Sequence, residues 1–91
     1  MKVLAIDPGT IKSGWAIYEN KNVLECGVLE NEEMKIKLNH IWMNIPNAQQ
    51  PNLLAIEMIA GYGMPVGKEV FETCVWIGRF IENWNGQYKL I

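Results

Sequence analysis

The sequence predicts a small α/β domain built on a mixed five-stranded sheet with helices packed on it. Three observations predict it: strand-like apolar segments joined by tight turns at the start, an amphipathic helical stretch in the middle, and a long helical stretch near the end. The element order is β-β-β-α-β-α-β. Tight turns join antiparallel strands, whereas strand-helix-strand crossovers join parallel strands with right-handed connections. Both kinds of pairing are therefore expected in one sheet.

Length and composition set the class of protein. Ninety-one residues form one domain, which buries roughly 60–65% of the surface that its unfolded chain exposes. The chain is 49% apolar and 20% charged, which is typical of globular rather than disordered proteins. No apolar run approaches the ~18 residues of a membrane span. The first apolar stretch ends at Asp7 without a signal-peptide cleavage site, so we expect an intracellular, cytoplasmic protein.

Charge and cysteine usage narrow the function classes. The net charge of −2 disfavours a binder that relies on a strongly basic surface. Cys26 and Cys74 lack the CxxC spacing of metal or redox sites, so we expect two buried, reduced thiols. His40 lies off the apolar stripe of its helix and is expected to be exposed. Nine of the ten acidic residues are Glu, and the single Asp is Asp7.

The first three predicted elements are strands. Residues 2–7 form an almost continuous apolar run, which suits a strand buried on both faces. Residues 14–19 and 23–30 read as the next two strands, and Asn20-Lys21-Asn22 between them is a turn of hairpin length. These three strands form an antiparallel meander.

Two helices alternate with the last two strands. The first helix shows apolar residues at helical spacing, can be capped by Asn31 and ends at Pro46; its stripe is Met34, Leu38, Ile41 and Ile45. Residues 53–57 form a strand, residues 68–84 the second helix and residues 87–91 the last strand. The second helix is apolar over a wide arc, so it should bury two faces, one on the sheet and one on the first helix or another subunit. We expect a dimer with Val70, Cys74, Ile77 or Phe80 near the two-fold axis.

Two acids follow the two most apolar strand segments. Asp7 ends the first and Glu57 ends the fourth. If these strands are parallel neighbours, the acids are separated by the ~4.8 Å strand spacing plus side-chain splay, and their charges repel. Mg²⁺ would relieve this repulsion and supports metal-assisted hydrolysis of a phosphodiester. Each acid also has a plainer interpretation, because Asp before Pro-Gly forms turns and Glu after a strand is usually solvated.

The turn after Asp7 and two later segments supply candidate contacts to phosphates and bases. Thr10 and Ser13 offer hydroxyls in a glycine-containing turn, and Lys12 adds a charge. Tyr62 could stack on a base, or it could pack its loop onto the second helix. Lys68 could meet a phosphate at a helix N-terminus, or it could be a solvated lysine.

The stretch IDPGTIKSGWAI, followed about fifty residues later by LLAIE and then a helix, resembles the RuvC-like Holliday junction resolvases of the RNase H-like superfamily. The resemblance implies an RNase H-like fold with strand order 3-2-1-4-5. It also implies a homodimeric DNA endonuclease that acts on branched DNA with Mg²⁺, or Mn²⁺ as a substitute. Asp7 and Glu57 fall on the first and second catalytic acids of the family. The helix after Glu57 falls where the family builds its dimer interface.

The chain also departs from that family pattern. The family completes its site with one or two Asp residues on a helix after the fifth strand, and no Asp follows Asp7 here. We therefore expect residues 1–91 to be a single RuvC-like domain that lacks the C-terminal catalytic helix and is inactive in this short form. The basic surface is thin, with Lys12, Lys68, Arg79 and Lys89 as candidates. The alternative is a non-catalytic dimeric DNA-binding or assembly module. A phosphate-binding half of an actin-like ATPase would need a much longer chain.

Overall fold

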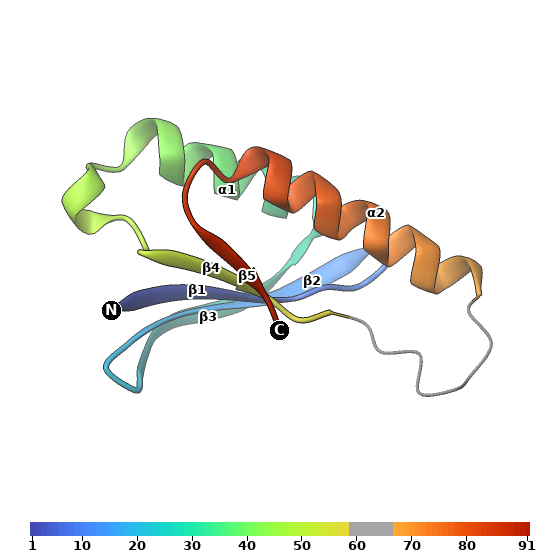
Figure 1. Ribbon diagram of the computed structural model, residues 1–91, viewed down its shortest axis with the longest axis horizontal. Helices are drawn as coiled ribbons and strands as arrows, with labels where there is room; N and C mark the ends of the chain where they lie inside the picture. The colour runs from blue at the N-terminus through green and yellow to red at the C-terminus, as the bar shows by residue number, and fades with distance from the viewer. Residues whose placement is uncertain (59–66) are drawn as a thin grey trace.

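The computed structural model describes residues 1–58 and 67–91, which form one five-stranded sheet and two α-helices. In chain order the elements are β1 (Lys2–Asp7), β2 (Lys12–Glu19), β3 (Asn22–Glu30), α1 (Asn31–Asn44), the 3₁₀ turn η1 (Asn47–Gln49), β4 (Leu53–Ile56), α2 (Lys68–Asn83) and β5 (Tyr88–Leu90). The strand order is β3-β2-β1-β4-β5. Pairs β1–β2 and β2–β3 are antiparallel, whereas β1–β4 and β4–β5 are parallel. The expected mixed sheet and its strand order are confirmed (Figure 1).

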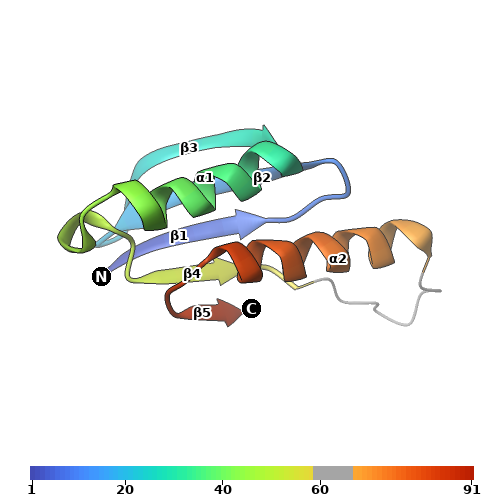
Figure 2. The same ribbon diagram turned by 90° about the horizontal axis from the view of Figure 1, so that it is seen from above.

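Both helices pack on the same face of the sheet (Figures 1 and 2). Side chains alternate between the two faces of a strand, so every second residue of β1 and β4 points toward the helices. The resulting core is formed by Leu4, Ile6, Leu54 and Ile56 of the sheet, Met34, Leu38 and Ile41 of α1, and Ile77, Phe80 and Trp84 at α2. Neither described helix is long and apolar enough to cross a membrane.

The β2–β3 connection is a two-residue hairpin turn. Glu19 pairs with Asn22, and Asn20 and Lys21 between them have φ angles of 52° and 68°. Two consecutive positive φ values define a type I′ turn, whose twist matches that of the flanking strands. Asn tolerates this conformation, whereas Lys adopts it at a cost. The turn confirms the predicted hairpin and sets the pairing of β2 with β3 next to it; the register then shifts between Ile17 and Tyr18.

The structure corrects the predicted dimer residues on α2. Ile77 is 3% exposed and Phe80 is fully buried, because both side chains fill the core between α2 and the sheet. They cannot therefore reach a second subunit. Cys74 is exposed and Val70 half-buried, so these two remain accessible to a partner. The helical period revealed two apolar faces, but it did not show which face meets the sheet.

The predicted environment of the two cysteines is also wrong. Cys26 and Cys74 are both exposed free thiols. Cys26 lies on β3, the edge strand of the sheet, and Cys74 lies on the outer surface of α2, so neither position is covered by a second layer. The expectation for His40 is confirmed, since it is exposed on α1 and contacts the side chain of Asn44 at 3.1 Å.

Candidate functional site

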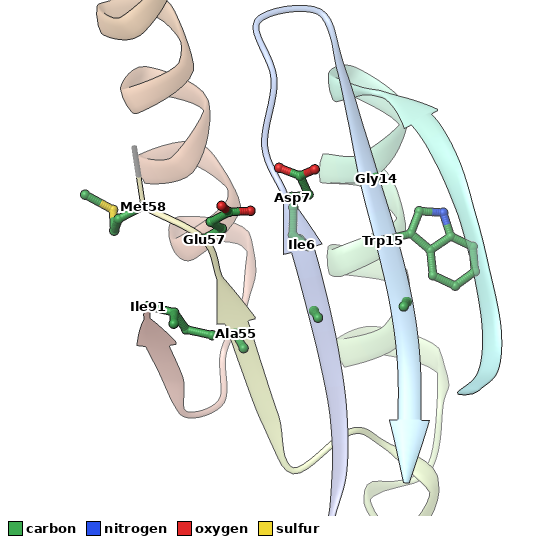
Figure 3. Close-up of a pocket in the computed structure, with 10 residues that line it drawn as sticks. Ile6, Asp7, Gly14, Trp15, Ala55, Glu57, Met58 and Ile91 are labelled. Carbon is green, nitrogen blue, oxygen red and sulfur yellow. The ribbon is translucent and has the colours of Figure 1, made fainter. Parts of the chain in front are cut away.

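The two acids leave neighbouring strands at the same edge of the sheet. In the parallel β1–β4 pair, Ile6 stands opposite Ile56, and Asp7 and Glu57 are the residues that follow. The backbone N–H of Glu57 donates a hydrogen bond to the carbonyl oxygen of Ile6 at 3.1 Å, which continues the pairing past the end of β4. Both carboxylates are exposed, and they lie on the same side of the sheet in Figure 3. The juxtaposition expected from the two strand ends is therefore present.

The acids lie at one end of a groove of about 620 Å³ on the sheet face opposite the helices. Its floor is built from small residues: Ala5 of β1 pairs with Ala16 of β2 on one side and with Ala55 of β4 on the other. Gly14, directly across from Asp7, continues this floor beneath the acids. Because none of these side chains is bulky, the approach to both carboxylates along the sheet is open.

Ile6 and Trp15 also line the groove, and Met58, just after Glu57, and Ile91, at the end of the chain, form its wall on the β4–β5 side (Figure 3). The N–H of Met58 donates to the carbonyl of Ile91, and the N–H of Ile91 donates to the carbonyl of Ile56, both at 2.9 Å. Sequence reasoning missed these groove residues and the row of three alanines. The alternation of small residues along the strands was a usable signal, but their alignment depends on the register between strands.

The turn after Asp7 is held by a closed set of three hydrogen bonds, one buried and two partly buried. The N–H of Gly9 donates to Ser13 Oγ at 3.3 Å, Ser13 Oγ donates to Asn31 Oδ1 at 2.6 Å, and Asn31 Nδ2 donates to the carbonyl of Gly9 at 2.9 Å. A Cβ at Gly9 would collide with the carbonyl oxygen of Lys12, so the turn requires glycine there. The turn is thus tied to the first residue of α1.

This network corrects two expectations. Ser13 is 1% exposed and its hydroxyl is bonded inside the protein, so it cannot contact a nucleic acid as predicted. Asn31 is the first residue of α1 rather than its cap; the cap position is Glu30, which makes no side-chain capping bond. The amide side chain of Asn31 turns back to the β1–β2 turn instead, where it donates to the partly buried carbonyl of Gly9.

The other predicted contact residues are spread over the molecule. Thr10 is half-buried in the turn after Asp7, and Lys12 is exposed at the start of β2. Lys68 is exposed at the start of α2, where its Nζ lies 3.6 Å from a carboxylate oxygen of Glu72. None of these three lines the groove. Tyr62 lies outside the described residues.

The donor set at the strand ends suits a hard cation. Among residues 1–58 and 67–91, no group of three or more His, Cys, Asp or Glu side chains could hold a metal ion, so Asp7 and Glu57 have no third such side chain beside them. Mg²⁺ takes oxygen ligands and is usually held by one or two carboxylates, with waters and substrate phosphate completing its octahedral shell. Two neighbouring exposed carboxylates beside an open groove fit that pattern. They fit a closed four-ligand zinc site poorly.

Comparison with solved structures shows the fold. Thermus thermophilus RuvC in complex with a Holliday junction substrate matches the whole chain with a TM-score of 0.77 at 12% identity. A second Thermus thermophilus RuvC structure matches with a TM-score of 0.73 at 14% identity. The chain spans 64% and 63% of the lengths of these two proteins. No protein-family model and no curated protein matches the sequence.

These likenesses establish a RuvC-like fold of the RNase H-like type. The five-stranded sheet with order β3-β2-β1-β4-β5 and two helices on one face is the shared architecture. At 12–14% identity the likeness concerns the backbone arrangement and not the side chains. The chemistry of the site therefore depends on Asp7, Glu57 and their surroundings in this chain.

Proposed function

We propose that this domain is a structure-selective DNA endonuclease that binds branched DNA and hydrolyses a phosphodiester at Asp7 and Glu57 with Mg²⁺. One observation carries the proposal: the two carboxylates end neighbouring parallel strands in register and share the head of an open groove. Three facts support the nucleic acid as substrate: the IDPGT and LLAIE motifs, the RuvC-like fold, and a structural neighbour solved with a Holliday junction. Mn²⁺ is the expected substitute for Mg²⁺.

The residues of this chain divide the work. Asp7 and Glu57 would hold the cation, whose positive charge would offset the repulsion between the two carboxylates. When bound, Mg²⁺ would supply positive charge that stabilises negative charge on a phosphoryl oxygen and makes a bound water more acidic. The alanine floor leaves room for a sugar-phosphate backbone to reach the acids. Thr10, in the turn after Asp7, and Lys12, at the start of β2, are proposed to contact flanking phosphates. Lys68 and Tyr62 are further proposed DNA contacts.

The dimer is part of the proposal and uses the outer face of α2. Phe71, Cys74, Val75 and Gly78 are exposed and occupy positions i, i+3, i+4 and i+7, so they share one face. Phe71 is 63% and Val75 52% exposed, which is unusual for large apolar side chains on a helix facing water. A Cβ at Gly78 would meet no atom within 4 Å, so the glycine serves no contact within the chain and leaves space for a close partner.

A junction-cleavage assay tests the proposed chemistry. The chain is incubated with a four-way DNA junction and, separately, with a linear duplex of the same sequence, in Mg²⁺ or Mn²⁺. Any Mn²⁺-dependent cleavage of the junction should exceed cleavage of the duplex and should be lost in Asp7→Asn and in Glu57→Gln. Glu33→Gln is the matched control, because it removes an exposed acid from the first turn of α1, outside the groove. Cleavage that survives Asp7→Asn contradicts the proposal.

A second function is favoured by the small number of acids at the site. Two carboxylates hold a metal weakly, and the described residues bring no third acid, His or Cys beside them. A non-catalytic, dimeric DNA-binding or assembly module would keep the fold and bind branched DNA without cutting it. In the same assay this alternative gives a shifted junction band in a native gel and no cleavage products. Asp7→Asn would then leave binding unchanged or strengthen it, since it removes a charge that repels phosphate.

A further inference from the structure

Two buried polar side chains hold the turn that follows Asp7. Ser13 is 1% and Asn31 2% exposed, and their contact is a hydrogen bond of 2.6 Å between buried side chains. Between them they bond both backbone polar groups of Gly9, two residues after Asp7. The N–H of Asn31 also donates to the carbonyl of Ile11 at 2.8 Å. The turn therefore has bonds to the start of α1 at two separate residues.

Burying polar side chains costs free energy unless they are hydrogen-bonded. The burial of Ser13 and Asn31 therefore suggests that their hydrogen bonds have a function. Thr73 is the other buried polar residue among those described, and it only bonds the carbonyl of Glu69 in its own helix. Ser13 and Asn31, by contrast, join segments eighteen residues apart. A network satisfied at every member fixes one local arrangement.

The carboxylate of Asp7 has no such support of its own. Among the described residues, no side-chain hydrogen bond or ion pair reaches it, and it is exposed. Its position depends on the backbone before and after it. The strand fixes the backbone before Asp7 through the pairing with Gly14 and β4. The Gly9 turn fixes the backbone after it.

We infer that Ser13 and Asn31 are positioning residues, which hold Asp7 where it can share a cation with Glu57. This inference rests on the proposed metal site. Ser13, in the IKSG segment, and Asn31, at the start of α1, would then contribute to the chemistry, although neither residue lines the groove. Residues that orient metal ligands in this way commonly change metal affinity by about 10–100-fold when they are replaced.

Three variants and one control test the inference through Mn²⁺ affinity, measured by calorimetry on folded protein. Ser13→Ala removes the hydroxyl, and Ser13→Thr keeps it. Asn31→Asp keeps the shape but replaces the Nδ2 donor with an oxygen. We expect about tenfold weaker binding for Ser13→Ala and Asn31→Asp, and recovery in Ser13→Thr. The added negative charge of Asn31→Asp by itself favours a cation, so weaker binding reports a displaced ligand.

Thr73→Ala is the matched control, because it also deletes a buried hydroxyl bond. It should lower the free energy of unfolding without changing Mn²⁺ affinity. If Ser13→Ala and Asn31→Asp behave like Thr73→Ala, the two residues are merely structural and the inference is overturned. If the unaltered chain binds no Mn²⁺, or Asp7→Asn binds it equally well, the proposed metal site itself fails.

A measurement without metal distinguishes a failure of the positioning inference from a failure of the proposed metal site. Backbone ¹⁵N relaxation reports the order parameter of each amide, which is about 0.85 in rigid backbone and below about 0.6 in flexible segments. Ser13→Ala should lower the order parameters of Asp7 and Gly9–Lys12, and Thr73→Ala should leave them unchanged. Unchanged order at Asp7 in Ser13→Ala overturns the inference whatever the metal data show.

Discussion

The hydrogen bond from the N–H of Glu57 to the carbonyl of Ile6, 3.1 Å long, places Glu57 directly beside Asp7. It extends the register of the β1–β4 pair by one residue beyond Ile56, the last residue of β4. Like charges on facing positions of neighbouring strands destabilise a sheet. Two ionised carboxylates at these positions would repel each other, and a cation between them would relieve that repulsion.

Removing one of the two charges should stabilise the metal-free protein. We expect Asp7→Asn and Glu57→Gln each to raise the free energy of unfolding by about 0.2–0.5 kcal/mol at low salt, because both sites are exposed and solvent screens the repulsion. Urea unfolding at two ionic strengths measures the effect, which should shrink at high salt. Mg²⁺ should stabilise the unaltered chain and the Glu33→Gln control, but neither site variant. Equal Mg²⁺ stabilisation of Asp7→Asn would contradict the assigned ligand.

Truncating Phe80 should nearly unfold the domain. Its ring is fully buried between α2 and the sheet, so Phe80→Ala removes core contacts and leaves a cavity, at a cost of about 3–5 kcal/mol. Phe71→Ala on the same helix should change stability by less than about 0.5 kcal/mol, because Phe71 is exposed. Chemical denaturation of dilute protein, where the monomer dominates, compares the two. Similar losses in both variants would mean that the two faces of α2 are wrongly assigned.

Sequence patterns were sufficient for the framework of the fold and for the acid pair. The apolar run before Asp7 and the run before Glu57 mark buried strands, and the crossover rule makes them parallel. The last residues of such parallel neighbours lie at the same edge of the sheet. The two acids could therefore be predicted to lie side by side, although they are fifty residues apart in the sequence. This prediction needed only element types and connection rules, which are local properties of the sequence.

The roles of Ser13 and of the faces of α2 required tertiary information. The sequence alone leaves open whether the Ser13 hydroxyl faces a ligand or the interior. Ser13 faces inward because it precedes the groove-lining Gly14 in β2 and because Asn31, at the start of α1, accepts its hydrogen bond. In α2, Phe71 and Phe80 both belong to apolar stripes of the same period. Which stripe meets the sheet depends on the rotation of the helix, and that is set by packing rather than by periodicity.

The β2–β3 turn should accept a stabilising substitution. Lys21 adopts a φ of 68°, where its Cβ is crowded and glycine is not. Lys21→Gly creates the Asn-Gly pair preferred in type I′ turns, and we expect a gain of about 0.5–1 kcal/mol in the free energy of unfolding. Lys21→Ala is the control, since it removes the same charge but keeps a Cβ. A gain of equal size in Lys21→Ala would assign the effect to charge rather than to backbone conformation.

A charge on the outer face of α2 should dissociate the proposed dimer. Val75→Glu places a carboxylate at the centre of the exposed apolar face, where burial without a partner is unfavourable in an assembly but harmless in the monomer. Sedimentation equilibrium should show a concentration-dependent dimer for the unaltered chain and a monomer for Val75→Glu. Ile36→Glu is the matched control, because Ile36 is an exposed apolar residue of α1 and lies outside the proposed interface. A monomer at high concentration of the unaltered chain would refute the interface, as would dissociation by Ile36→Glu with no effect of Val75→Glu.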